Sequence, residues 1–207
     1  MKKIDFKKLI KKHWIHLLAF GLFILTTFIY FQPQFSGYGL VQHDIEQFKG
    51  MSNEINHHRE TVGEEPLWTN SMFGGMPTYQ ISTYFEGNLV GRTAKALQLW
   101  MASPAGLFFA YLIGFYIMLL CMRINPKVAI LGAFAFAFSS YYIIIIQAGH
   151  DTKAMAIAFA APVVGAFYMA YRSSIKWGLL LSALFMGFEL YANHIQVTYY
   201  LAILLIF

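Results

Sequence analysis

Long apolar runs separated by short polar turns dominate the pattern of this chain. A membrane-spanning helix needs about 20 apolar residues, and the runs of that order predict five complete spans. The first run carries aromatic side chains at both ends, as segments that reach both membrane interfaces do. The pattern therefore predicts an all-α polytopic membrane protein, with complete spans at residues 14–31, 104–122, 128–146, 154–171 and 177–193.

A sixth apolar run begins near Ile195 and continues to Phe207. At 1.5 Å per residue, a helix over this run is about 20 Å long, against a hydrocarbon core of roughly 30 Å. We therefore expect the sequence to be the N-terminal part of a longer protein, with residues 104–207 forming the second to sixth spans.

The first apolar run follows a basic leader, which also fits a cleaved signal peptide. However, the sequence FQPQFSG after the run has no small-x-small cleavage site, and the run is long for a signal core. We expect an uncleaved signal anchor.

Basic residues are distributed asymmetrically along the chain. Six lysines lie within the N-terminal segment 1–13, and the loops on the same side of the predicted bundle contain Arg123, Lys127, Arg172 and Lys176. These ten are the majority of the 15 Lys and Arg residues. Since cytoplasmic loops carry such an excess, the N-terminus is predicted to be cytoplasmic.

Composition supports this class of protein. Hydrophobic residues make up 58% of the 207 residues and charged residues only 12%, against about 25% in soluble domains. The net charge of +5 lies in short segments beside the membrane, so we expect no nucleic acid partner. The single cysteine, Cys121, excludes an intramolecular disulfide and a cysteine-based metal site.

Residues 32–103 form a large extracytoplasmic loop between the first two spans. Apolar positions recurring at steps of four and three predict a helix over 40–58, and a second helix over 88–101 is expected in the membrane interface. The stretch between them is rich in turn formers and aromatics. It fits a compact cap on the bundle or a loop that cradles substrate, with Trp68 contacting a sugar or a lipid.

An acidic pair, Asp44 and Glu46, opens the loop helix. On a helix, residues two apart do not share a face, so joint binding of one divalent ion would need an extended backbone. A carboxylate on an outer loop is most often simply solvated. It is also ionised at neutral pH and suited to general-base chemistry.

Two further outer turns carry polar side chains. Residues 149–153 contribute His150, Asp151 and Lys153, and residues 192–196 contribute His194 and Gln196. Ordinary solvated turns or helix ends explain them equally well. If they are functional, we expect both turns to pack beside the 40–58 helix and to form one polar pocket with it.

Two other polar features have simple explanations. Glu189 lies near the outer end of the fifth span, where a carboxylate is either functional, directed outward or bonded to a neighbouring helix. His57 and His58 are adjacent, so on a helix they diverge by about 100°, and no zinc-binding spacing surrounds them. We predict no metal site there.

The topology resembles the GT-C superfamily of membrane glycosyltransferases, and the chain is more closely similar to the YfhO family of bacterial membrane proteins. The resemblance covers essentially the whole chain in order. It rests on QHDIEQFKGMSNE at 42–54, PLWTNSMFGGMPTYQ at 66–80, QAGHDTK at 147–153 and NHIQVTYY at 193–200. It implies a GT-C-like helix bundle with a large first extracytoplasmic loop in the bacterial cytoplasmic membrane.

This resemblance implies a function. The protein would transfer a sugar from a polyprenyl-phosphate carrier to an extracytoplasmic cell-envelope glycopolymer, with Asp44 as candidate base and Glu46 as its companion. His150, Lys153 and His194 would meet the lipid phosphate, and Asp151, Gln196 and Trp68 complete the candidate substrate-binding residues. A divalent ion is left open as cofactor. The alternatives are a transporter or lipid-handling protein, and a non-catalytic scaffold of an envelope-assembly complex.

Overall fold

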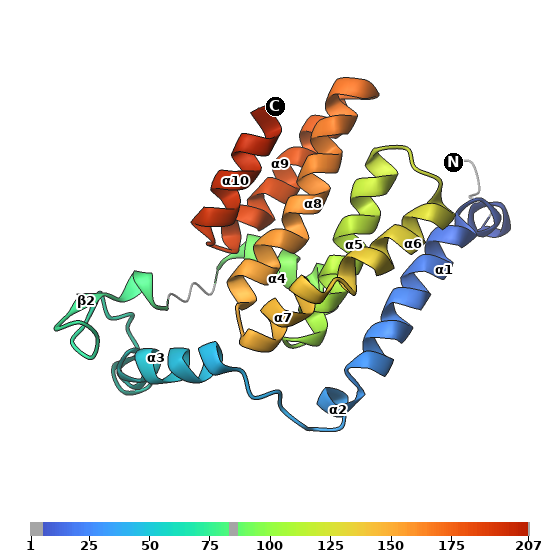
Figure 1. The fold of residues 1–207 in the computed structure, drawn as a ribbon. Coiled ribbons are helices and arrows are strands. Elements are labelled where there is room, and N and C mark those ends of the chain that lie inside the picture. Colours follow the sequence, from blue (N-terminus) through green and yellow to red (C-terminus); the bar gives the residue numbers. More distant parts are fainter. Residues whose placement is uncertain (1–5, 83–86, 207) are drawn as a thin grey trace.

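The computed structural model describes residues 6–82 and 87–206, so Lys2 and Lys3 of the basic leader lie outside the described residues. The all-α architecture is confirmed, with helices packed side by side in a bundle (Figure 1). The bundle is made of α1 (Phe6–Tyr30), α5 (Ala105–Cys121), α6 (Pro126–Ala137), α7 (Ser140–Ala148), α8 (Asp151–Arg172), α9 (Ile175–Tyr191) and α10 (Ile195–Ile206).

The segment between α1 and α5 forms a second structural region. After the short α2 (Gln32–Phe35), α3 (His43–Val62) leads away from the bundle (Figure 1). Two features differ from the sequence-based expectation, because α3 continues past residue 58 and the turn-rich stretch contains a small hairpin. The remaining elements are β1 (Trp68–Thr69), β2 (Met76–Pro77), the 3₁₀ helix η1 (Thr78–Gln80) and α4 (Leu89–Leu97).

Two described helices are long and apolar enough to cross a membrane, namely Lys11–Tyr30 within α1 and all of α8. A third span results if the bent pair α6 and α7 is taken as one. α5 and α10 are apolar but shorter. The chain therefore has the character of a membrane protein, while the full set of five spans stays a prediction.

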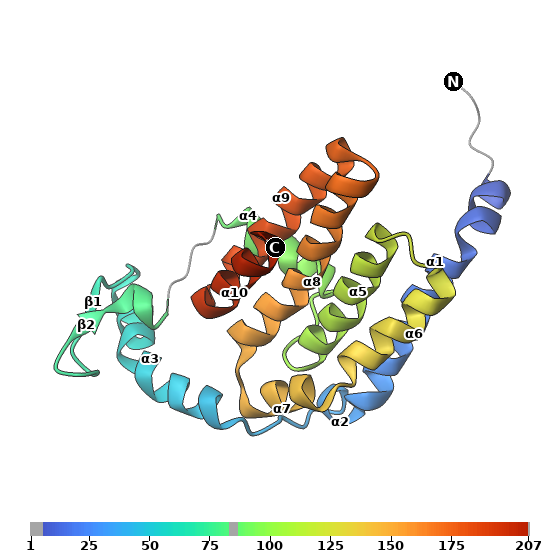
Figure 2. The same cartoon turned by 45° about the horizontal axis from the view of Figure 1, so that its top comes forward.

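The expected third span at 128–146 is wrong in its continuity. α6 ends at Ala137, and α7 starts at Ser140 after a bend of 49°. The break occurs at Ser139, whose backbone is extended at φ −59° and ψ 133°. The Ser139 side chain makes no capping hydrogen bond, and the aromatic and β-branched residues around it lose side-chain freedom in a continuous helix. As a result α7 lies across the end of the bundle, near α2 (Figure 2).

The bundle core is built around α5. Its residues Phe108, Phe109, Tyr111 and Leu112 are fully buried, with α8 on one side and α1 and α6 on the other. α6 presents a stripe of small, fully buried side chains four residues apart at 129, 133 and 137, all alanine. Small residues allow helix backbones to approach closely, which compensates for the missing hydrophobic drive between helices in lipid.

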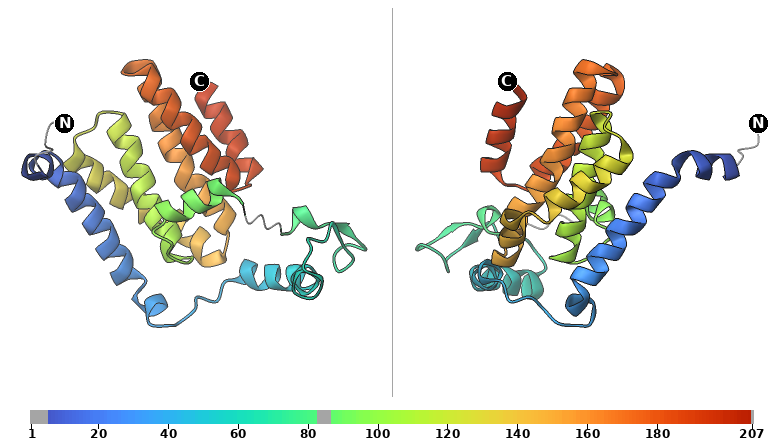
Figure 3. Two further views of the ribbon diagram at one scale, coloured as in Figure 1. Left: turned by 180° about the vertical axis from the view of Figure 1, so that it is seen from behind. Right: turned by 45° about the vertical axis from the view of Figure 1, so that its right-hand side comes forward.

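The turns that the sequence places on one side of the membrane lie together at one end of the bundle. Figure 3 shows the N-terminal end of α1, the α5–α6 turn and the α8–α9 turn at one end, with α2, α3 and α7 at the opposite end. The turns at the first end carry Arg123, Lys127, Arg172 and Lys176 within or beside them, and we call the opposite end the outer end.

Cysteine labelling of intact cells tests this orientation. In a background lacking Cys121, a membrane-impermeant thiol reagent is expected to label cysteines placed at Asn88 or His150, because both lie at the outer end. Cysteines at Arg123 or Arg172 are expected to react only after the membrane is permeabilised. Labelling of position 123 in intact cells would contradict the orientation.

Candidate functional site

The beginning of α3 is fastened to the corner between α7 and α8. The buried side chain of Gln42 donates from Nε2 to the carbonyl oxygen of Ile146 at 2.5 Å. Gly149, at φ +92°, lies directly against Gln42 and Ile45, and a Cβ atom at this position would stand 3.0 Å from Gln42 Cβ and 3.2 Å from Ile45 N. Both the left-handed backbone and the close approach require glycine here.

This docking brings two of the predicted site residues together. Nδ1 of His150 lies 2.6 Å from Oδ2 of Asp44, and their side chains are 47% and 44% exposed. The expectation that turn 149–153 packs beside the loop helix is thereby confirmed. The other carboxylate oxygen, Oδ1, is 3.7 Å from His43 Nδ1, beyond hydrogen-bond distance. It therefore remains available to accept a proton or a hydrogen bond from a ligand.

The first turn of α8 adds a cation and a second acid. Nζ of Lys153 lies 5.5 Å from the ring centroid of Tyr141, a cation–π geometry that holds the ammonium group over α7. Asp151, the first residue of α8, has the Ser103 side chain as its hydrogen-bonding neighbour. Its Oδ1 is buried and, within the described residues, accepts no hydrogen bond.

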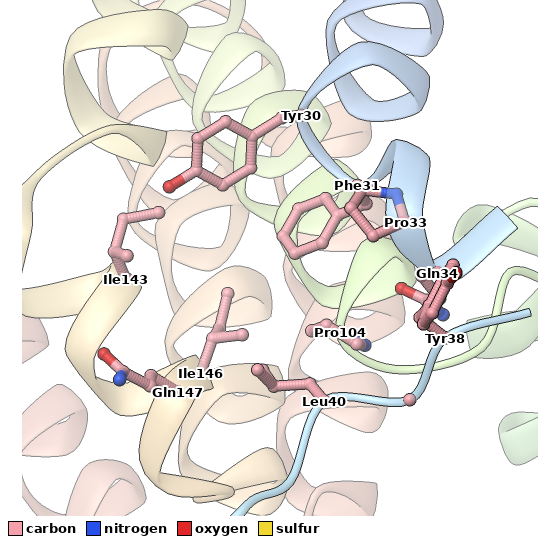
Figure 4. Close-up of a pocket in the computed structure, with 11 residues that line it drawn as sticks. Tyr30, Phe31, Pro33, Gln34, Tyr38, Leu40, Pro104, Ile143, Ile146 and Gln147 are labelled. Atoms are coloured by element: carbon pink, nitrogen blue, oxygen red, sulfur yellow. The ribbon is translucent and has the colours of Figure 1, made fainter. Parts of the chain in front are cut away.

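A mainly apolar cavity of about 370 Å³ lies at the same end of the bundle, and its described lining includes neither Asp44 nor His150. Figure 4 shows the side chains of Tyr30, Phe31, Leu40, Ile143 and Ile146 around it, so its walls come from the outer ends of α1 and α7 and from the strand-like stretch before α3. The carbonyl group of Ile146 is the one that anchors α3, so the same residue lines the cavity and holds the start of the helix that carries Asp44.

Gln34 fixes the polar side of this cavity. Its Nε2 donates to the carbonyl oxygen of Ser103 at 3.1 Å, and its Oε1 accepts from the backbone N–H of Ala105 at 3.1 Å. The short α2 is thereby tied to the start of α5. Nothing in the sequence marks this residue as special.

Glu46 lies apart from the Asp44–His150 pair. Its carboxylate binds Lys49 at 2.7 Å on the surface of α3. Because the backbone is helical from His43 onward, Asp44 and Glu46 point in different directions, and the extended backbone that joint ion binding would need is not present. Among the described residues, no three His, Cys, Asp or Glu side chains converge to hold a metal ion.

The second outer turn lines a second cavity. His194 lines this cavity, of about 410 Å³, with Thr198, and its Nδ1 lies 3.4 Å from the backbone N of Val197. Gln196 is exposed on the first turn of α10. Within the described chain, no hydrogen bond or ion pair joins His194 to α3. That this turn shares one polar pocket with α3 stays a prediction.

Glu189 is fully buried beside this second cavity. The hydroxyl of Thr198 donates to it, at 2.9 Å from Oε1 and 3.1 Å from Oε2. The sequence left open whether this carboxylate is functional, directed outward or bonded to a neighbouring helix. The structure shows the bond to a neighbouring helix, which joins α9 to α10.

Trp68 is also distant from the Asp44–His150 pair, because the hairpin is attached to the middle of α3. Glu54 accepts hydrogen bonds from Thr69 Oγ1 at 2.5 Å, from Asn70 N at 3.1 Å and from Ser71 N at 2.8 Å. Ten residues of helix separate Asp44 from Glu54, which corresponds to about 15 Å.

The Glu54 contacts predict a pH-dependent hairpin. The hydrogen bond from Thr69 and those from Asn70 and Ser71 lower the pKa of Glu54 below its ordinary value of 4.5. A carboxyl group with a lowered folded-state pKa stabilises the fold above its unfolded pKa, and this contribution disappears as the pH falls through the lower value. Amide exchange at residues 69–71 is therefore expected to accelerate specifically below about pH 4.5. In Glu54→Gln this acid-induced step should vanish, and its persistence would show that Glu54 does not fix the hairpin.

The sequence reasoning missed two residues that position the site. Gln42 anchors α3, and Tyr141 holds Lys153. The position of Gln42 could have indicated this role. It stands directly before the helix that carries the acidic pair, where a polar side chain is free to bond to another element.

Comparisons with models of protein families, with curated proteins and with solved structures gave no match to this chain.

Proposed function

We propose that this protein is a GT-C-like membrane glycosyltransferase of the YfhO type, which moves a sugar from a polyprenyl-phosphate carrier to a cell-envelope glycopolymer. The reaction would take place on the outer face of the bacterial cytoplasmic membrane. The observation that carries the proposal is the Asp44–His150 pair, with its 2.6 Å contact, at the outer end of a bundle whose α7 also lines an apolar cavity.

In this proposal Asp44 is the base. Its Oδ1 accepts the proton of the acceptor hydroxyl while that oxygen attacks the anomeric carbon of the sugar. The bond between the anomeric carbon and the phosphate oxygen breaks, and its electron pair leaves with the lipid phosphate. Since His150 holds Oδ2, the carboxylate is fixed in orientation, which is how a positioned base gains efficiency.

The leaving phosphate needs positive or hydrogen-bonding groups. His150 has its Nδ1 on Asp44, so Nε2 is the nitrogen that faces a ligand, and Lys153 lies three residues further along the same helix start. The apolar cavity suits the first isoprene units of the carrier, whose chain continues into the bilayer.

A lipid-handling protein without transferase chemistry is the second candidate, because the apolar cavity by itself fits a lipid chain. Reconstitution separates the two. The full-length protein in vesicles, supplied with radiolabelled polyprenyl-phosphate sugars and isolated envelope glycopolymer, is expected to move label onto the glycopolymer. Saturable binding of the carrier without any transfer would overturn the enzyme proposal in favour of lipid handling. Absence of both would favour the scaffold.

A further inference from the structure

The β1–β2 hairpin exposes an unusual amount of apolar surface. Leu67 is 85% exposed, Trp68 55%, Phe73 90% and Tyr79 64%. The whole stretch 66–82 contains no charged residue, whereas the preceding α3 carries acidic and basic side chains along its length. Exposed apolar patches bordered by polar surface mark places where a protein meets another phase or partner.

The hairpin is held in one shape rather than being a loose loop. Thr69 is fully buried and bonded to Glu54 on α3, and the Thr78 hydroxyl donates to the carbonyl group of Pro66. Since successive side chains on a strand point to opposite faces, Trp68 points away from α3 when Thr69 points toward it. The indole ring covers Gly75, where a Cβ atom would come within 2.7 Å of Nε1.

The position of the hairpin relates this surface to the membrane. Figures 1 and 3 show it beyond the far end of α3, to the side of the helix bundle and on the bundle side of α3. It therefore lies laterally, where lipid surrounds the bundle, near the outer ends of the helices. In α4, the next helix along the chain, Leu89 is strongly exposed, and so is Trp100 shortly after the helix ends.

We propose that the β1–β2 hairpin inserts into the outer-leaflet interface of the bilayer, with Phe73 at its tip and Trp68 on its lipid-facing side. Trp and Tyr rings prefer the headgroup level, and an apolar residue at a tip gains by leaving water. The absence of charge in 66–82 removes the cost that an inserted charged side chain would carry. Anchored in this way, the far end of α3 is supported by lipid while its beginning is fixed to α7. This inference rests on membrane embedding of the bundle and is independent of the proposed transferase activity.

An environment-sensitive probe on the hairpin tests the proposal. In a Cys121→Ser background, an NBD fluorophore is attached to Asn70→Cys, whose side chain is exposed, and the whole chain is reconstituted in phosphatidylethanolamine–phosphatidylglycerol vesicles. The probe is expected to emit at a shorter wavelength than in water. Nitroxide-labelled lipids should quench this emission, and iodide should not. The matched control is NBD on Glu60→Cys of α3, which is expected to emit as in water and to be quenched by iodide.

Phe73→Asp supplies the second variant. It leaves the Glu54 bonds in place and is expected to abolish quenching of the position-70 probe by nitroxide lipids. Water-like emission of that probe in the unmodified hairpin would overturn the proposal. A second outcome would also overturn it. If the probe is shielded from iodide only in vesicles that hold several chains, and not in vesicles that hold one, a second copy of the protein covers the hairpin.

Discussion

Replacement of Asp44 with Asn is expected to lower sugar transfer by about 10²- to 10⁴-fold, which corresponds to roughly 3 to 5.5 kcal/mol of activation barrier. The substitution removes the charge and the basicity of the side chain. It keeps the size and an oxygen at the position of Oδ2, which lies 2.6 Å from His150 Nδ1. Folding and membrane insertion should therefore barely change, and the loss should appear in the rate of transfer at equal membrane abundance.

Glu46→Gln is the matched control for this experiment. Glu46 is an acid on the same helical turn, but its carboxylate binds Lys49 at the surface. Exposed ion pairs of this kind contribute about 0.2–1 kcal/mol at most, so both stability and transfer should stay close to those of the parent protein. Equal activity of Asp44→Asn and the parent would remove Asp44 from catalysis, and would favour the lipid-handling and scaffold alternatives.

Gly149→Ala is expected to separate Asp44 from His150 without touching either. A non-glycine residue at φ +92° costs about 1–2 kcal/mol, and the added Cβ would lie 3.0 Å from Gln42 Cβ and 3.2 Å from Ile45 N. Because Ile45 N is a backbone atom, the close contact with it is relieved only if the start of α3 moves. A cost of this size should raise amide exchange in the first turn of α3 by a factor of about 5–30. Transfer should fall with it.

Gly50→Ala gives the comparison for this substitution. Gly50 lies within α3, where a Cβ atom would meet nothing within 4 Å, and alanine favours helix. Exchange in α3 should therefore stay equal or slow down. If Gly149→Ala also leaves exchange and transfer unchanged, the close packing of α3 against the α7–α8 corner is not what assembles the Asp44–His150 pair.

Much of the architecture follows from local pattern. The apolar runs predicted the positions of the bundle helices, and the basic loops predicted which ends lie together. The stripe beginning at Val41 predicted the helix that carries Asp44 and Glu46, and the i, i+2 spacing predicted that these two acids diverge. These features depend on periodicity and charge within short stretches, which is why sequence alone was sufficient for them.

The hairpin and the bend between α6 and α7 were not predicted. Gly74 and Gly75 are turn signals in either a loop or a hairpin, and the bonds that select the hairpin come from Glu54, far along the chain. Likewise, an unbroken apolar run does not distinguish a straight span from one that bends by 49° at Ser139.

The sequence by itself determined that the chain is helical and membrane-like, and that most of its acids and histidines lie in the loop 32–103 and the two outer turns. Only the tertiary structure decided which of them meet. Asp44 pairs with His150 because Gln42 bonds to Ile146 and Gly149 admits α3 at close range, whereas His194 lines a second cavity and Trp68 lies on the hairpin. Such choices depend on contacts between residues about a hundred positions apart, and periodicity carries no information about which distant surfaces fit together.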